Sequence, residues 1–315
     1  MNKFPYPMAQ IRTNNPAPEL LSFARQHGGE VMEVRNLSWD HGESAVWQLQ
    51  TPSGEFILKA HRQGRKFTQE LTAYREWLPR LQEAGQGSGR TGFPGLVASR
   101  TGAPRALLLT FEPGELLQDL EEGVASGELG QEERLAAFQA AGTFLRRLHD
   151  LPLVDDDPLP LADAYALRTD SWLQRAREVV PQAVRDWVAR QAEEAVPVLR
   201  QQVRVPTHRD YTPRNWLLER STGRLTIFDF EHSRPDLLVG DFERLWGQRW
   251  PRDPAGREAF MDGYGRELSG AEEALLERIA ALGGLTTVVW AREHRDREFE
   301  RQGWEVLARL GCPGV

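Results

Sequence analysis

Apolar and polar residues alternate between positions 37 and 60 in a pattern that predicts strands. The segments SAVWQLQ and EFILKA are separated by TPSG, and this turn sequence between two apolar runs predicts a β-hairpin. The run RALLLTF at residues 105–111 predicts one more buried strand. With a short helix expected over residues 19–26, these elements predict that the first part of the chain is mainly antiparallel β.

A helical pattern follows over residues 67–81. The apolar residues of FTQELTAYREWLPRL form one stripe when they are placed about 100° apart around a helix axis. Glu70 lies inside that stripe, whereas Glu76 lies on the opposite side. A carboxylate on the buried side needs a cationic partner, because burying an unpaired charge costs several kcal/mol. Lys59, on the strand before this helix, is the expected partner of Glu70.

Apolar residues recur every three or four positions in the second half of the chain, which predicts helices. The pattern is clear in QEERLAAFQAAGTFLRRLH at residues 131–149 and is repeated over residues 171–202 and 272–310. One interruption lies between residues 215 and 230. There NWLLE and LTIFDF flank the turn sequence RSTGR, which predicts a second antiparallel hairpin inside the helical part.

The predicted elements divide the chain into a β-rich part and a helical part. The segment EPGE at residues 112–115 breaks regular structure after the last predicted strand of the first part. We therefore expect an N-terminal lobe over residues 1–111, a hinge over 112–115 and a helical lobe over 116–315. The Gly-rich segment EAGQGSGRTGFPG before the last strand is expected to be an irregular connector.

The second hairpin gathers polar residues at its open end. A turn centred on Thr222 places Asn215 and Asp229 opposite each other, and Asp210 lies in the loop that leads into the hairpin. Carboxylate and amide oxygens are the hard ligands that Mg²⁺ prefers. They are too few for a complete site, so the remaining positions would be taken by water or by a substrate phosphate.

Composition excludes several classes of function. No apolar run reaches the roughly 18 residues of a membrane-spanning helix, and the N-terminal residues contain no apolar core of a signal peptide. We therefore expect a cytoplasmic protein without membrane contact. Cys312 is the only cysteine, which rules out a disulfide framework or a thiolate metal site.

Charge adds two expectations about ligands. The formal net charge of −7 argues against nucleic-acid binding and favours a cationic small molecule as a partner. The 39 lysine and arginine residues include only three lysines, at positions 3, 59 and 66. A lysine kept inside an apolar strand indicates chemistry that needs a compact ammonium group.

These motifs resemble those of the protein-kinase-like superfamily, and more narrowly those of the aminoglycoside phosphotransferase and choline kinase family. The similarity rests on the segment HRDYTPRN, on the strand end DFE, and on the strand lysine and helix glutamate that precede them. It covers roughly residues 37–310. The resemblance implies an α+β, bilobal protein-kinase-like fold with a small, mainly antiparallel β N-lobe and a larger, mainly helical C-lobe.

The resemblance also implies roles for the polar residues of the hairpin and the strand. Asp210 would be the catalytic base that accepts the proton of the attacking hydroxyl. Asn215 and Asp229 would hold Mg²⁺ against the phosphates of ATP. Lys59 would contact the α- and β-phosphates and would be held in place by Glu70.

Two further segments would contact the nucleotide by the same resemblance. The backbone of residues 109–114, which include Glu112, would form the hinge beside the adenine. The loop over residues 38–45 would cover the phosphates, with Gly42 and Ser44 as its contacts. Phosphoryl transfer requires this kind of site, because catalysis depends on in-line positioning and on neutralising the phosphate charge.

The implied activity is ATP- and Mg²⁺-dependent transfer of the γ-phosphate to a hydroxyl of an amino-alcohol, an aminoglycoside or a sugar-like molecule. One alternative is a Ser/Thr protein kinase, which the HRD sequence with Arg209 favours. No APE sequence follows Asp229, however, and the phosphate loop has one glycine. A non-catalytic pseudokinase is the second alternative. The sequence leaves open the acceptor, the choice of ATP or GTP, a metabolic or antibiotic-modifying role, and the oligomeric state.

Overall fold

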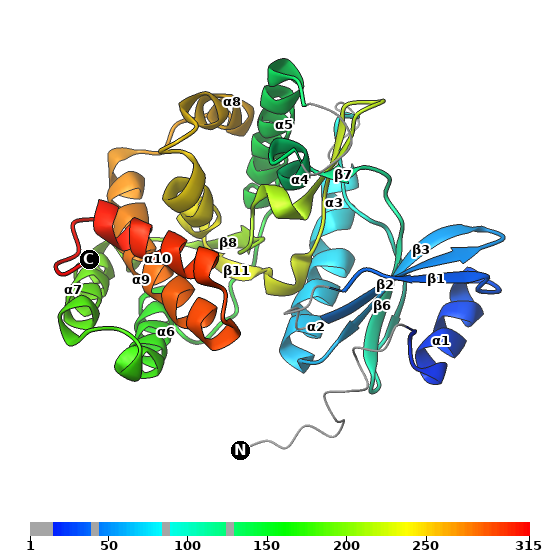
Figure 1. The fold of residues 1–315 in the computed structure, drawn as a ribbon, viewed down its shortest axis with the longest axis horizontal. Coiled ribbons are helices and arrows are strands. Elements are labelled where there is room, and N and C mark those ends of the chain that lie inside the picture. The colour runs from blue at the N-terminus through cyan, green and yellow to red at the C-terminus, as the bar shows by residue number, and fades with distance from the viewer. Residues whose placement is uncertain (1–14, 39–43, 84–88, 124–128) are drawn as a thin grey trace. The chain divides into compact units, whose positions relative to one another are not determined.

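The structure is a computed structural model that describes residues 15–38, 44–83, 89–123 and 129–315 (Figure 1). The chain forms two compact units. Unit 1 comprises Met1–Ser126 and Arg214–His232, and unit 2 comprises Gly127–Pro213 and Ser233–Val315. The chain thus returns to unit 1 for one excursion of 19 residues, the hairpin segment. The predicted hinge at residues 112–115 lies within unit 1.

Unit 1 contains a five-stranded sheet with the order β1-β2-β3-β6-β5, in which all neighbours are antiparallel. Its strands are β1 (Glu33–Asn36), β2 (Ser44–Thr51), β3 (Gly54–His61), β5 (Leu96–Arg100) and β6 (Arg105–Thr110). Both strand predictions are confirmed: β2 and β3 form the hairpin, and β6 is the apolar strand. The buried residues Trp47, Leu49 and Leu58 pack against α1 (Pro18–Gly28), so this amphipathic helix covers the apolar side chains of the sheet.

The predicted helix after β3 is confirmed, with one irregularity. It consists of α2 (Gly64–Thr72), a π-helical turn (Ala73–Trp77) and α3 (Leu78–Glu83), which follow one another without a break. Pro79 lies just after the π-helical turn. Because proline has no N–H and its ring clashes with the carbonyl four residues earlier, a widened turn at this place accommodates it.

A second sheet of unit 1 has the order β4-β10-β9-β7. Its strands are β4 (Thr91–Gly92), β7 (Glu115–Leu116), β9 (Trp216–Glu219) and β10 (Arg224–Ile227), and α4 (Leu117–Glu121) follows β7. The hairpin of β9 and β10 is confirmed. Sequence analysis missed β4 and β7, because each has two residues and no apolar alternation. The Arg224 guanidinium lies directly against Gly92 in β4, where a Cβ would lie 2.3 Å from it, so a larger residue would require this side chain to shift.

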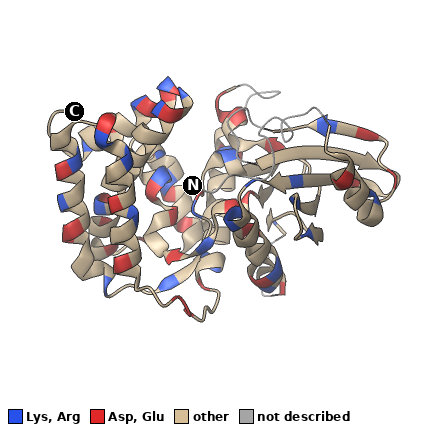
Figure 2. Cartoon of the chain, turned by 90° about the horizontal axis from the view of Figure 1, so that it is seen from below, with Lys and Arg blue, Asp and Glu red and all other residues tan. Residues whose placement is uncertain are grey.

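Unit 2 is mainly helical, as predicted. Its helices are α5 (Gln131–His149), α6 (Leu161–Arg175), α7 (Gln182–Leu199), α8 (Pro254–Tyr264), α9 (Gly270–His294) and α10 (Arg297–Arg309). Two glycines let α5 and α8 approach closely: a Cβ on Gly142 would lie 2.0 Å from the Phe260 carbonyl, and one on Gly263 would lie 1.9 Å from that of Gln139. Figure 2 shows acidic and basic residues interspersed along the helices of this unit.

One helix among the described residues is long and apolar enough to cross a membrane. It is α9, whose mean hydropathy over an 18-residue window is 1.3, and 67% of that window is buried. Burial of this extent is typical of a core helix, and α9 packs against α7 and α10.

Unit 2 also contains a short antiparallel ladder that the sequence did not predict. It pairs β8 (Arg204–Thr207) with β11 (Arg234–Leu237), with Thr207 opposite Arg234. The chain leaves unit 2 shortly after β8 and returns just before β11. The ladder therefore holds together the two ends of the excursion into unit 1 and fixes where the HRD loop begins.

Candidate active site

The ammonium group of Lys59 is the centre of a buried ion cluster in unit 1. Its Nζ lies 2.8 Å from Glu70 Oε2, 2.5 Å from Asp229 Oδ1 and 3.2 Å from Glu231 Oε2. The predicted ion pair between Lys59 and Glu70 is confirmed. Burial alone would lower the pKa of Lys59, but the three carboxylates together raise it well above its usual value. The lysine is therefore held as a cation.

A second lysine completes this cluster. Lys66, in the first turn of α2, lies 2.7 Å from Glu231 Oε1, and the hydroxyl of Ser44 donates to Glu231 Oε2 at 2.6 Å. Burial would raise the pKa of Glu231, but Lys59 and Lys66 lower it far below its usual range. Sequence analysis did not assign roles to Lys66 and Glu231. The scarcity of lysine, which identified Lys59 as a candidate site residue, could have identified Lys66 in the same way.

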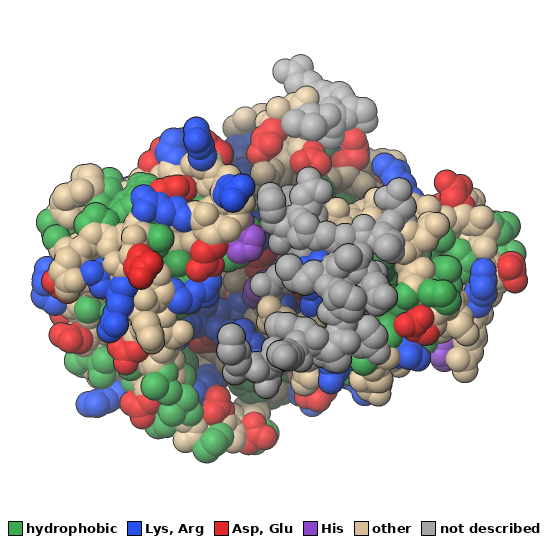
Figure 3. All heavy atoms as spheres, turned by 60° about the horizontal axis from the view of Figure 1, so that its bottom comes forward, with side chains coloured by type: hydrophobic (Ala, Val, Ile, Leu, Met, Phe, Trp, Pro, Cys, Tyr) green, Lys and Arg blue, Asp and Glu red, His purple; other side chains and the backbone are tan. Residues whose placement is uncertain are grey.

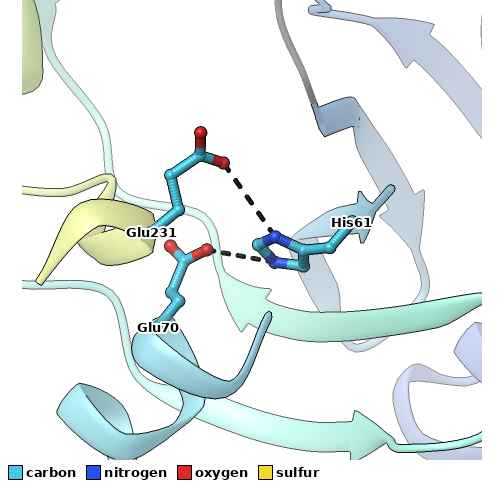
Figure 4. A group of neighbouring side chains, drawn as sticks. All are labelled: His61, Glu70 and Glu231. Carbon is cyan, nitrogen blue, oxygen red and sulfur yellow. Dashed lines mark ion pairs between the residues drawn. The ribbon is translucent and has the colours of Figure 1, made fainter. Parts of the chain in front are cut away.

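His61 extends the cluster between two of its carboxylates (Figure 4). Its Nε2 lies 3.1 Å from Glu70 Oε2 and its Nδ1 lies 3.9 Å from Glu231 Oε2. One ligand atom from each of these three residues lies within 4.8 Å of the others, a spacing that a metal ion could bridge. Because Lys59 and Lys66 contact the same carboxylates, a cation here would have to displace an ammonium group. The arrangement is therefore an ion-pair network.

Asn215 and Asp229 both lie just beyond the paired residues of the hairpin, but their predicted register is wrong by one residue. The ladder pairs Glu219 with Arg224 and Trp216 with Ile227, which leaves a loop of four residues. Such a loop has its centre between two residues and not on Thr222. Asn215 consequently lies opposite Phe228, whose N–H donates to the Asn215 carbonyl at 3.1 Å.

The backbone at Asp229 turns sharply as the strand ends. Its φ of 65° is in the left-handed region, which aspartate tolerates better than most residues. The turn leads into a 3₁₀ helix (Phe230–His232). Asn215 is buried, and the Asp229 side chain is 30% exposed, so it is accessible to a ligand. Joint coordination of Mg²⁺ by these two residues stays a prediction.

Asp210 lies in unit 2, in a braced loop. The carboxylate of Asp241 accepts hydrogen bonds from the backbone N–H groups of His208, at 2.9 Å, and of Arg209, at 2.5 Å. Burial would raise the pKa of Asp241, but the hydrogen bond with His149 and the backbone donors lower it. The buried Asp210 carboxylate lies 3.3 Å from the guanidinium of Arg244. Asp241 is thus a loop-bracing residue.

The remaining predicted residues belong to the hinge and to the loop before β2. The carboxylate of Glu112 accepts a hydrogen bond from the Thr110 hydroxyl at 2.8 Å and forms an ion pair with Arg224 at 3.1 Å. Its side chain therefore fixes the segment between the two sheets of unit 1. Ser44 begins β2 and contacts Glu231, as given above. Gly42 lies outside the described residues. Contacts of these residues with a nucleotide stay predictions.

Comparison with known structures shows the class of fold. The chain resembles APH(2")-IIia in its complex with GDP and kanamycin, with a TM-score of 0.69, 14% identity, and coverage of 95% of this chain and 100% of that one. It resembles a thermostable mutant of APH(4)-Ia in a ternary complex with ADP and hygromycin B, with a TM-score of 0.67, 14% identity, and coverage of 94% and 99%. A third match is the GDP complex of aminoglycoside 2'-phosphotransferase-IIIa, with a TM-score of 0.67, 13% identity, and coverage of 93% and 97%. The α+β, protein-kinase-like fold is therefore confirmed.

The sequence itself identifies the family. A model of the phosphotransferase enzyme family matches residues 33–282, which is most of the chain. No curated protein sequence matches this chain significantly. The chain belongs to the phosphotransferase enzyme family.

Proposed function

We propose that the protein transfers the γ-phosphate of ATP to a hydroxyl group of a small molecule, in a reaction that depends on Mg²⁺. The observation that carries the proposal is the buried Lys59 cluster in unit 1. A lysine held as a cation between a strand and a helix, beside an acidic residue at the end of a hairpin, is the arrangement with which protein kinases hold the phosphates of ATP. The proposal places the protein in the cytoplasm, where ATP is available.

The charges of the cluster are consistent with a metal ion beside Asp229. Three carboxylates face two ammonium groups, which leaves one excess negative charge when His61 is neutral. Asn215 and Asp229 provide an amide oxygen and a carboxylate oxygen, which suit Mg²⁺. The ion would neutralise charge on the transferred phosphoryl group. In this arrangement Asp229 would exchange its contact with Lys59 for the metal, and Lys59 would turn to the phosphates.

Asp210 would accept the proton of the attacking hydroxyl. The bracing of its loop by Asp241 keeps the backbone fixed, so the carboxylate can hold the hydroxyl in one orientation. A general base of this kind contributes roughly 10²- to 10⁴-fold to the rate. The acceptor is proposed to be an amino-alcohol, an aminoglycoside or a sugar-like molecule.

Radiolabelled ATP, with and without Mg²⁺, tests the proposal on a panel of these acceptors. We expect transfer to at least one class, and we expect EDTA to abolish it. Asp229→Asn should weaken the dependence of nucleotide binding on Mg²⁺, whereas Asp150→Asn, which changes an exposed aspartate, should not. Transfer to no small molecule, with nucleotide binding retained, would contradict the proposal. Label on proteins of a lysate alone would favour a protein kinase.

A further inference from the structure

Three arginines of unit 2 converge on one carboxylate oxygen. Asp236 Oδ2, on β11, lies 3.3 Å from Arg168 Nη1, 3.3 Å from Arg209 Nε and 2.8 Å from Arg234 Nη2. They come from α6, from the HRD loop and from β11, so the fold and not one local sequence motif brings them together. We call these four residues the arginine cluster.

The arginine cluster carries more positive charge than one carboxylate can compensate. Burial and repulsion by Arg209 lower the pKa of Arg168, and they lower that of Arg234 to about 10. Burial would also lower the pKa of Arg209, but Asp236, Asp241 and Glu243 raise it. Burial would raise the pKa of Asp236, but the guanidinium groups of the cluster hold it far below its usual range. Like charges at this spacing are unfavourable, so an additional anion would stabilise the cluster.

The guanidinium groups also have hydrogen-bond donors to spare. A guanidinium has five N–H donors, and three of them present fifteen to their surroundings. Among the residues that the structure describes, Arg209 Nε has no hydrogen-bond partner, because its contact with Asp236 lacks the required geometry. The side chains of Arg168, Arg209 and Arg234 are 26%, 19% and 28% exposed, so a ligand can reach them. Figure 3 shows basic side chains interspersed with acidic ones on the drawn face of the molecule.

Packing also keeps the arginine cluster in place. A Cβ on Gly240 would lie 2.0 Å from Arg209 Nη1, so the guanidinium lies directly against this glycine. Arg168 stacks on the Tyr165 ring with 5.3 Å to the ring centroid. Two other acids are close enough to interact with Arg209. Asp241 is occupied by backbone N–H groups and His149, and burial raises the pKa of Glu243.

The cluster adjoins the loop of Asp210. Arg209 precedes Asp210 in the chain, and Arg244 lies 3.3 Å from the Asp210 carboxylate. The acidic run at residues 155–157 pairs with Arg204, which lies 2.9 Å from Asp155 and 3.6 Å from Asp157. Arg209 and Arg244 therefore bring positive charge to the loop of Asp210, where Glu243 is also close enough to interact with Asp210.

We propose that the phosphate acceptor carries an anionic group, a carboxylate or a phosphate, that binds to Arg168, Arg209 and Arg234 while its hydroxyl faces Asp210. This inference rests on the proposed function and names the class of its acceptor. The planar donor pairs of a guanidinium group match the geometry of carboxylate and of phosphate, so arginines suit a site for either anion. Of the acceptors proposed above, this leaves sugar-like molecules that carry an anionic group, because a cationic amino-alcohol or aminoglycoside would be repelled.

Binding of inorganic phosphate tests the anion site independently of activity. We expect calorimetry to detect phosphate binding to the wild type, and Arg168→Gln to raise its Kd about tenfold, the factor for loss of one hydrogen bond to a charged group. Arg168→Lys should restore part of the affinity. Arg175→Gln removes an exposed arginine from the same helix and should leave the Kd unchanged. Equal Kd values in the wild type and Arg168→Gln would show that the cluster only braces the fold.

Transfer to matched acceptors tests the second half of the proposal. Glycerol, choline, glycerate and glycerol 3-phosphate offer hydroxyl groups with no charge, a positive charge, a carboxylate and a phosphate. We expect the lowest KM for one of the two anions, and we expect Arg168→Gln to raise that KM about tenfold with little change in kcat. A lower KM for choline or glycerol would overturn the inference. Transfer to no acceptor, with arginine-dependent phosphate binding intact, would refute the proposed function and leave the anion site standing.

Discussion

Replacing Lys59 by Met removes the cation that three buried or half-buried carboxylates share. The net charge of the cluster changes from −1 to −2 with His61 neutral. Breaking a buried ion pair from one side costs about 3–5 kcal/mol. Glu70 is 1% exposed and has no lysine partner in this variant. We therefore expect a loss of stability near the upper end of this range, about 5 kcal/mol.

The partner substitution should cost less. Glu70→Gln leaves Lys59 with Asp229 and Glu231, and it brings the net charge of the cluster to zero. What is lost is one charged hydrogen bond, worth about 1.5–3 kcal/mol. Comparing the two variants therefore tests whether loss of the lysine or loss of the glutamate charge lowers the stability more.

The effect of Lys59→Met also depends on pH, with a sign that follows from the carboxylates. Despite burial, the pKa values of Glu70 and Glu231 are lowered, chiefly by Lys59, so their stabilisation is present above their ordinary value of 4.5 and is lost as pH falls below it. Glu231 keeps Lys66 in Lys59→Met, but Glu70 loses its lysine, so burial would raise the pKa of Glu70. The folded variant would then bind protons more readily than its unfolded chain, and its deficit relative to the wild type should shrink from pH 7 to pH 5.

Urea unfolding followed by tryptophan fluorescence measures these differences, with Trp47 and Trp77 as buried reporters in unit 1. Glu55→Gln changes an exposed carboxylate on the same strand and should stay within about 0.5 kcal/mol of the wild type. The reasoning fails if Lys59→Met unfolds no more easily than this control. It also fails if Glu70→Gln is the less stable of the pair at pH 7, or if the deficit of Lys59→Met grows as pH falls.

Three further predictions concern unit 2. Asp210→Asn should lower kcat roughly 10²- to 10⁴-fold in the transfer assay and leave nucleotide affinity unchanged; a loss of affinity alone would argue against a base. Ser269→Ala should lower the free energy of unfolding by about 0.5–2 kcal/mol, because Ser269 and Glu272 form a capping box at α9. The hydrogen bond from Arg266 lowers the pKa of Glu272 to about 2. The contribution of this carboxylate to the free energy of unfolding should therefore be lost only as the pH falls below 4.5, its ordinary pKa. Gly142→Ala should cost about 1–3 kcal/mol in thermal unfolding, since its Cβ would lie 2.0 Å from the Phe260 carbonyl, and an unchanged Tm would contradict the packing.

Local patterns in the sequence were sufficient to predict much of unit 1. Alternation and turn residues fixed the hairpin of β2 and β3, because a strand with one buried face has a period of two. The stripe on the helix after β3 placed Glu70 on its buried side and predicted the contact with Lys59, which the structure confirms at 2.8 Å. Each of these inferences used residues that are neighbours along the chain.

The predictions that failed or were not made required more than a local pattern. The register at Asn215 and Asp229 depends on whether the loop has an odd or an even number of residues, and RSTGR permits both. The two-residue strands β4 and β7 have no period to detect. The pairing of β8 with β11 depends on the chain leaving unit 2 and returning after 19 residues.

The sequence by itself determined the family, the fold and the residue types that phosphoryl transfer needs. Only the tertiary structure decided which charges meet. Lys66 and Glu231 are separated by 165 residues but lie 2.7 Å apart. Arg168 and Arg209, from two other elements, join Arg234 at Asp236. The physical reason is that periodicity reports which face of an element is buried, whereas the balance of charge at a buried place depends on every element that contributes a side chain there.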